Sequence, residues 1–168
     1  SFQNEAETKI VKLQKENTDF RSMAYANGSI YVLNAGTPAN MYTLNTFGYS
    51  CASNLIYTES GEKVFYDSMF IDIKTGFGVV IGDPTEDCLS VLLTENSGKN
   101  WKKIPCDILP KIVEGEAAFA ASDTNVKIVD GVIYIISGGK KSRLFMSEDK
   151  GSTWQVFDTP IIQGEAMT

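Results

Sequence analysis

The chain has 168 residues, of which 43% are hydrophobic and 21% are charged, which suits one globular domain with a hydrophobic core. Its net charge of −6 and pI near 4.7 argue against nucleic-acid binding, which draws on clustered Lys and Arg side chains. The absence of histidine excludes Ser-His-Asp and Cys-His catalysis, and no apolar run approaches the roughly 20 residues of a membrane-spanning helix.

The first predicted unit begins at Phe20 and reads FRSMAYANGSIYVLNAGTPANMYTLN. The stretch before it, SFQNEAETK and onward, opens with neither a Met nor an apolar signal segment, which indicates a processed chain or a piece of a longer one. We expect a short strand over Ser22–Tyr25, a hairpin turn at Asn27-Gly28, and a strongly apolar strand that ends at Gly36. A third strand, NMYTLN, follows.

Two further units follow the same order, from Tyr66 and from Gly115. In each, a strand of small and apolar residues comes first, over Ser68–Ile73 and over Ala117–Ala121. Next come a turn, a strongly apolar strand (GFGVVIGD or GVIYIISG) and a third strand (CLSVLLTE or RLFMSE). A fourth strand is expected around WKKI in one unit and WQVF in the other.

Four antiparallel strands repeated in one order, without helical periodicity, predict an all-β chain made of β-propeller blades. Because propellers close with about four to eight blades, we expect a single partial domain of about three to three and a half blades. The expected blades are 16–65, 66–114 and 115–157, with 1–15 and 158–168 in adjacent blades. The remaining blades or self-association would cover the open edges, which invite strand pairing.

Two phrases, TENSGKNW and SEDKGSTW, stand between the predicted third and fourth strands of their units. Both have a hydroxyl residue, an Asn or Asp, a Gly and a Trp in fixed order: Thr94, Asn96, Gly98 and Trp101, then Ser147, Asp149, Gly151 and Trp154. The Asn or Asp can accept hydrogen bonds from its own turn, and the glycine supplies a positive φ. A calcium loop is the alternative, but D-x-[DN]-x-[DN]-G is absent. We therefore predict structural turns.

SEDKGSTW resembles the Asp-box, also called the bacterial neuraminidase (BNR) repeat, S-x-D-x-G-x-T-W, and TENSGKNW is a weaker copy. From Phe20 onward the wider pattern, including GFGVVIGDPTEDC and SGGKKSRLFMSEDKGSTW, is similar to exported BNR-propeller proteins of Bacteroidetes type. Those proteins are often named oxidoreductase or glycosyl hydrolase, and are related to photosystem II assembly-factor-like and sialidase-like propellers. The resemblance implies a bacterial protein that is periplasmic, on the cell surface or secreted, with this chain as an interior part.

A charged residue stands near the start of each predicted innermost strand: Arg21, Asp67 and Glu116. If the units align as blades, these side chains converge on the central channel and, with Arg143 at a blade edge, form a ligand-binding site. The alternatives are structural. Arg21 pairs with Asp67, and Glu116 accepts backbone N–H donors.

The loop GDPTEDC contains three carboxylates, Asp83, Glu86 and Asp87. They are a candidate oxygen-ligand set for a hard cation or, as we prefer, a solvated acidic turn. The basic loop SGGKKSR, which ends at Arg143, occupies the same place one unit later and is also expected to be solvated. We expect a salt bridge between the two loops, which contributes little if it is exposed.

An enzymatic function would rest on few residues. Tyr66 beside Asp67 is a candidate nucleophile pair, with Glu116 as a further carboxylate. A sialidase uses an arginine triad, whereas only Arg21 and Arg143 stand at blade edges. No G-x-G-x-x-G opens a helix, so an oxidoreductase activity has no basis here and no cofactor is expected. We expect a non-catalytic binding or scaffold propeller with a glycan or protein partner. The alternative is a sialidase-like glycoside hydrolase completed by blades outside this chain.

The three cysteines, Cys51, Cys88 and Cys106, match no metal-ligand spacing. If Thr94 and Trp101 close a hairpin, antiparallel register places Cys88 almost opposite Cys106, which suits a cross-strand disulfide in an oxidising compartment. The alternative is a pair of reduced cysteines that pack in the core. Cys51 would remain free.

Overall fold

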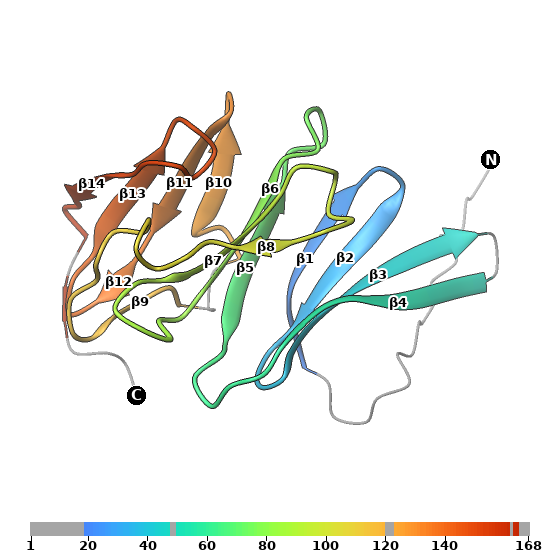
Figure 1. Ribbon diagram of the computed structural model, residues 1–168, viewed down its shortest axis with the longest axis horizontal. Coiled ribbons are helices and arrows are strands. Elements are labelled where there is room, and N and C mark those ends of the chain that lie inside the picture. The colour runs from blue at the N-terminus through green and yellow to red at the C-terminus, as the bar shows by residue number, and fades with distance from the viewer. Residues whose placement is uncertain (1–18, 48–49, 120–122, 162, 165–168) are drawn as a thin grey trace, which may run out of the picture.

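The computed structural model describes residues 19–47, 50–119, 123–161 and 163–164, without the side chains of residues 46–51. These residues form 14 strands in four antiparallel sheets and contain no helix, which confirms the all-β prediction (Figure 1). The expected adjacent-blade segment 1–15 and the last four residues lie outside the described residues, as does the side chain of Cys51.

The first sheet has the order β1-β2-β3-β4. Its strands are β1 (Phe20–Ala26), β2 (Ser29–Asn34), β3 (Ala39–Phe47) and β4 (Ser50–Glu59). The turn between β1 and β2 holds Asn27 at φ 54° and Gly28 at φ 79°, which is the left-handed pair that a tight hairpin requires. The expected Asn-Gly hairpin is therefore present.

The second sheet has the order β5-β6-β7-β8. Its strands are β5 (Tyr66–Ile71), β6 (Gly78–Gly82), β7 (Ser90–Thr94) and β8 (Lys102–Lys103). All residues of β6 and β7 are buried, because this sheet lies between the other two large sheets and packs on both faces. That position explains why the predicted strands in this unit read as almost continuous apolar runs.

The third large sheet has the order β10-β11-β13-β14, and a small sheet pairs β12 with β9. The strands are β9 (Glu116–Ala117), β10 (Val126–Val129), β11 (Val132–Ile136), β12 (Gly138–Gly139), β13 (Arg143–Ser147) and β14 (Gln155–Asp158). Phe145, Ile133 and Ile135 of this sheet share a core with Val79, Ile81 and Val91 of the second sheet. A second core joins the second sheet to the first.

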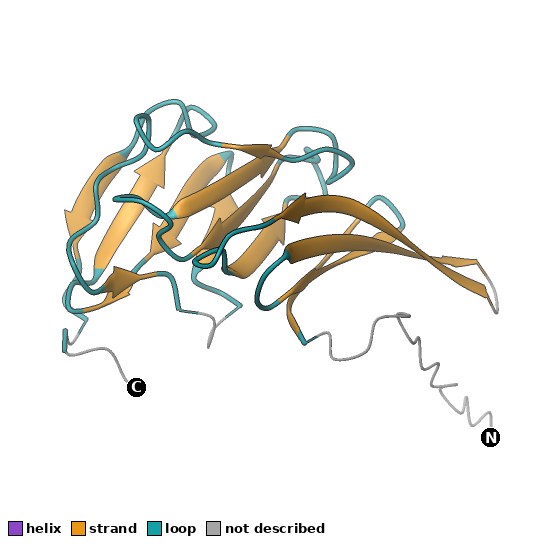
Figure 2. Cartoon of the chain, turned by 60° about the horizontal axis from the view of Figure 1, so that its bottom comes forward, coloured by secondary structure: helices purple, strands orange, loops and turns teal. Residues whose placement is uncertain are grey.

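The three large sheets stand side by side like the leaves of a fan (Figures 1 and 2). Their first strands are neighbours, since β5 contacts both β1 and β10. Within the described residues the sheets do not close into a ring or barrel. The outer faces of the two end sheets are apolar and exposed, at Met23 (63%) and Tyr25 (61%) on one side and at Phe157 (45%) on the other.

The innermost strand of the third sheet differs from the prediction. It begins at Val126, whereas we expected a strand over Ala117–Ala121. Pairs across the first hairpin of each sheet, Met23 with Val32, Met69 with Val80 and Val126 with Ile135, define the true alignment. In that alignment Thr124 stands where Arg21 and Asp67 stand in the other sheets. Additional residues therefore stand in the sequence between Ala117 of β9 and Thr124, and the small-residue pattern, which resembles a first strand, concealed them.

Arg21 and Asp67 both lie at a β-bulge, where the pairing shifts between β1 and β2 and between β5 and β6. At the second bulge the backbone lies close to Gly82, where a Cβ would clash with the Phe65 carbonyl oxygen and lie 2.9 Å from the Tyr66 Cα.

We expect Gly82→Ala to lower the free energy of unfolding by about 2–3 kcal/mol, because the added methyl group overpacks this site. Gly28→Ala, where a Cβ meets nothing within 4 Å, should cost about 1 kcal/mol, from its positive φ alone. Urea unfolding of both variants measures the difference, and equal losses would contradict the clash.

Candidate functional site

The two Trp-containing phrases form the turns between β7 and β8 and between β13 and β14. The Thr94 hydroxyl accepts from the Gly98 N–H at 3.0 Å, and the Ser147 hydroxyl accepts from the Gly151 N–H at 2.7 Å. Both glycines have positive φ, 82° and 84°. The two turns therefore share one internal design, in agreement with the prediction of structural turns.

The Asn or Asp of each phrase is held by its own turn. Asn96 accepts from the Asn100 N–H at 3.0 Å. Asp149 accepts from the Thr153 N–H at 2.8 Å and from the Thr153 hydroxyl at 2.6 Å, and these bonds lower the pKa of its carboxyl group. The Trp154 indole N–H donates to the Gly151 carbonyl at 3.1 Å. The hydroxyl and the Asn or Asp side chain of each turn are thus bonded within the turn, whereas the buried Trp101 indole N–H has no hydrogen-bond partner among the described residues.

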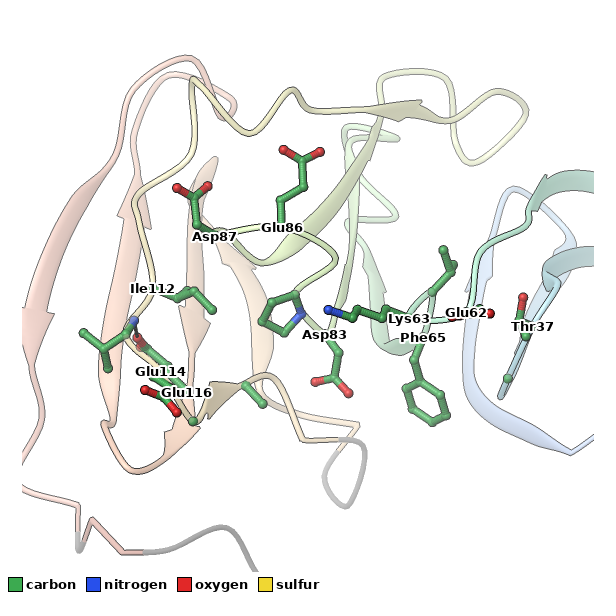
Figure 3. Close-up of a pocket in the computed structure, with 16 residues that line it drawn as sticks. Thr37, Glu62, Lys63, Phe65, Asp83, Glu86, Asp87, Ile112, Glu114 and Glu116 are labelled. Carbon is green, nitrogen blue, oxygen red and sulfur yellow. Dashed lines mark hydrogen bonds between the residues drawn. The ribbon is translucent and has the colours of Figure 1, made fainter.

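A cleft of about 820 Å³ opens at the opposite ends of the sheets from these turns (Figure 3). Its walls are the loops that join β4 to β5, β6 to β7 and β8 to β9, together with the turn after β2. Among the described residues, six carboxylates and one lysine line it: Glu62, Asp83, Glu86, Asp87, Glu114, Glu116 and Lys63. The cleft is therefore strongly acidic.

Two of these carboxylates are neutralised by cations of the chain. Asp87 pairs with Lys111 at 2.6 Å, and Glu116 pairs with Arg143 at 2.6 Å. Within the part of the chain that the structure describes, Glu62, Glu86 and Glu114 are exposed and make no ion pair. The cleft consequently offers unpaired negative charge to solvent.

Glu116 and Arg143, two of the expected ligand-binding residues, bind each other instead. The Arg143 guanidinium donates to both carboxylate oxygens, at 2.9 and 2.6 Å, and the Ser137 hydroxyl and Val113 N–H also donate to Glu116. Burial alone would raise the pKa of Glu116, but these donors outweigh it and lower the pKa. The alternative in which Glu116 accepts a backbone donor is confirmed. Arg143 is not a solvated residue, since its side chain is only 14% exposed.

Asp67 carries a second buried carboxyl group, which does not itself line the cleft. It is 1% exposed, and its Oδ2 atom has no hydrogen-bond partner. Burial, followed by repulsion from Asp83, raises the pKa of Asp67 to about 8, against a smaller lowering by Arg21. Asp83 lines the cleft and accepts from the Ala118 N–H at 3.3 Å, and burial raises its pKa too. The two carboxyl groups form a pair that disfavours double ionisation.

Arg21 does not form the expected direct pair with Asp67. Its guanidinium lies 3.8 Å from Asp19, and both side chains are largely exposed. Arg21 acts on Asp67 through its charge alone. The convergence of Arg21, Asp67 and Glu116 that the sequence suggested is therefore wrong for Glu116.

Tyr66 is not an accessible nucleophile. Its side chain is completely buried between the first and second sheets, and its hydroxyl donates to Glu59 at 2.7 Å. Tyr57 donates to the same carboxylate at 2.5 Å, and Lys103 forms an ion pair with it. Tyr66 therefore belongs to a structural network that ties β4 to β5 and β8, and the idea of a Tyr66–Asp67 catalytic pair is corrected.

The candidate metal ligands do not converge. Figure 3 shows Asp83 pointing away from Glu86 and Asp87. Across the described residues, no three His, Cys, Asp or Glu side chains are grouped as metal ligands. Asp83 and Asp87 accept hydrogen bonds from separate donors, the Ala118 N–H and the Lys111 ammonium group.

The expected salt bridge between the acidic and basic loops, both of which the structure describes, does not form, and charged residues of both loops pair with other residues. Asp87 of the acidic loop pairs with Lys111, on the segment after β8. In the basic loop, Lys141 pairs with Asp158 at 2.8 Å, and Arg143 reaches Glu116. Lys111, on the segment after β8, contacts both loops: its ammonium group pairs with Asp87, and its carbonyl group accepts from Arg143 at 2.8 Å.

Cys88 and Cys106 are bonded to each other, with an S–S distance of 2.08 Å and Cα atoms 5.7 Å apart. The Cα separation is ordinary for a disulfide. The bond ties the loop before β7 to the segment after β8, which carries one wall of the cleft.

Sequence reasoning missed Glu62 and Glu114 as neighbours of the acidic loop, because they lie in loops that only the fold brings together. The signal available in the sequence was that both are carboxylate residues in loops. No family model and no curated protein sequence matches this chain. In the described residues there is no helix with the length and apolar character needed to cross a bilayer.

Proposed function

We propose that the three large sheets are blades of a β-propeller to which further blades belong. Three observations support this: the shared strand order, the common register of the first hairpins, and the side-by-side first strands. The exposed apolar outer faces at Met23 and Phe157 are the surfaces on which neighbouring sheets would pack. The Cys88–Cys106 disulfide supports our proposal that the protein is exported to an oxidising compartment.

We propose that the chain is a non-catalytic binding module whose acidic cleft holds a Lys- or Arg-bearing segment of a partner protein. The observation that carries this proposal is the set of three exposed, unpaired carboxylates, Glu62, Glu86 and Glu114, around one cleft. Charge of one sign in a concave site attracts ligands of the opposite sign and accelerates their association. Loops on a rigid sheet scaffold are a usual place for such sites.

A glycan ligand has less support than a basic segment. Of the residues that the structure describes, Phe65 is the one aromatic residue in the cleft lining, whereas sugar binding favours aromatic faces beside carboxylates. The alternative of a glycoside hydrolase rests on the Asp67–Asp83 pair, in which one carboxyl group would be protonated near neutral pH. Release of nitrophenol from aryl glycosides would favour that alternative, and loss of the activity in Asp83→Asn would locate it.

The test is the binding of a fluorescent, acetylated and amidated pentaarginine peptide at low salt. We expect the triple variant Glu62→Gln/Glu86→Gln/Glu114→Gln to bind about tenfold or more weakly than the wild type, because three attractive charges are lost. Raising the salt concentration should weaken wild-type binding by screening.

The matched control removes the same charge elsewhere. Glu95, Asp130 and Glu148 are exposed residues of turns and lie outside the cleft lining. The variant Glu95→Gln/Asp130→Asn/Glu148→Gln should bind the peptide within about twofold of the wild type, since only long-range charge changes. Equal weakening in both triple variants would show general attraction to an acidic protein and would overturn the proposed site.

A further inference from the structure

Among the described residues, four buried side-chain polar atoms have no hydrogen-bond partner, and the Asp67 Oδ2 atom is the one that belongs to a carboxyl group. Asp67 itself is nearly inaccessible. A buried, unsatisfied carboxylate is costly, and such groups in native proteins commonly reflect a functional state or a bound proton or ion. The bulge in β5 fixes Asp67 in this place, since Gly82 allows the chain to approach closely.

The charged groups around Asp67 come from two other elements. Asp83, in the loop after β6, is close enough for the two charges to repel, and Arg21, at the matching bulge of β1, is close enough to attract. Asp123, which precedes β10, accepts a hydrogen bond from the Ser22 hydroxyl at 2.5 Å. The hydroxyl of the adjacent Tyr66 is directed to Glu59. Asp83 is therefore the dominant neighbour.

Asp83 connects this buried group to the cleft. It is partly exposed, it lines the acidic cleft, and Figure 3 shows its carboxylate directed away from the rim where Glu86 and Asp87 lie. A cation that reaches Asp83 would reduce the repulsion that Asp83 exerts on Asp67. The occupancy of the cleft and the protonation of Asp67 are then linked.

We propose that Asp83 forms the inner seat of the cleft, and that the buried Asp67 holds a proton when the cleft is empty and releases it when a guanidinium or ammonium group binds at Asp83. The proton passes to the buffer, the cation takes its place as counter-charge, and no covalent bond changes. This inference rests on the proposed function, since the basic segment is the ligand. It adds the chemical group that occupies the deepest position and makes binding tighter as pH rises.

The experiment measures pentaarginine binding by calorimetry at about pH 6 and about pH 9. Arginine keeps its charge at both values. We expect wild-type affinity to rise about tenfold or more, since release of one proton for each bound peptide allows up to about tenfold per pH unit below the pKa of the group that loses it. At about pH 8, two buffers of different ionisation enthalpy should give different apparent heats that report this proton. Asp67→Asn should bind with the weaker, low-pH affinity at both values and release no proton.

The control is Asp87→Asn, a carboxyl that lines the same cleft but pairs with Lys111. It should keep the wild-type pH dependence. If wild-type protein binds the peptide with no change between the two pH values and no proton release, the inference fails while the proposed function stands. If no binding occurs at either pH in low salt, both fail. Should Asp67→Asn not fold, the two-buffer measurement on the wild type decides alone.

Discussion

Replacing Arg143 by methionine is expected to lower the free energy of unfolding by about 3–5 kcal/mol, because a buried charge loses its partner. The Glu116 carboxylate is completely buried, and Arg143 supplies two of its hydrogen bonds. The Ser137 and Val113 donors remain but carry no net charge. Urea unfolding at neutral pH measures the loss.

The control for this prediction is Lys141→Met, which removes a cation from the same loop. Its partner Asp158 is 70% exposed, so the loss should be at most about 1 kcal/mol. The folded pKa of Glu116 is lowered from 4.5, so its pair stabilises the fold above that pH and the contribution is lost as pH falls through the lower folded value. The penalty of Arg143→Met should therefore shrink in acid. Equal losses in the two variants at neutral pH would contradict the buried pair.

Wild-type stability is expected to fall as pH rises from about 6 to about 8, and Asp67→Asn should remove most of that fall. The folded pKa of Asp67 is raised from 3.8 to about 8, mainly by burial. The unfolded chain is therefore ionised in this range while the folded protein must keep a proton, so stability is greatest at low pH and is lost as pH approaches the folded pKa. Over these two pH units the change is about 2 kcal/mol.

Chemical denaturation at several pH values checks this second prediction. Asp130→Asn changes an exposed turn residue and should reproduce the wild-type pH curve. The experiment needs no ligand, so it tests the buried carboxyl group independently of the cleft. A wild-type curve that is flat between pH 6 and pH 8 would show that Asp67 ionises without cost and would contradict its raised pKa.

Local features were predictable because neighbouring residues determine them. The Asn27-Gly28 hairpin follows from the left-handed conformations that these residues tolerate. The Asp149 turn follows from hydrogen bonds to residues at most four positions away. The Cys88–Cys106 bond, left open between two alternatives by the sequence, depends on the hairpin register that Thr94 and Trp101 imply.

The third inner strand shows where such reasoning failed. Small residues near Ala117 imitate the first strand of the other units, but the register of Val126 with Ile135 shows that the strand begins later. Similarity between segments of one chain does not show where additional residues interrupt a repeat. Only pairing with a neighbouring strand shows where the repeated strand begins. Because of this error, Glu116 was aligned with Arg21 and Asp67, whereas Thr124 occupies the equivalent position in the third sheet.

The sequence by itself determined an all-β chain with repeated four-stranded units, since alternation, hairpin turns and apolar runs are read within a few residues. The tertiary structure alone decided which charges meet. Arg143 was predicted as a solvated or ligand-binding residue and is the buried partner of Glu116. Asp67 became the buried member of a pair with Asp83 only when the bulge and the loop after β6 came together. Burial and charge proximity depend on contacts between distant segments, and these two quantities control the chemistry of the cleft.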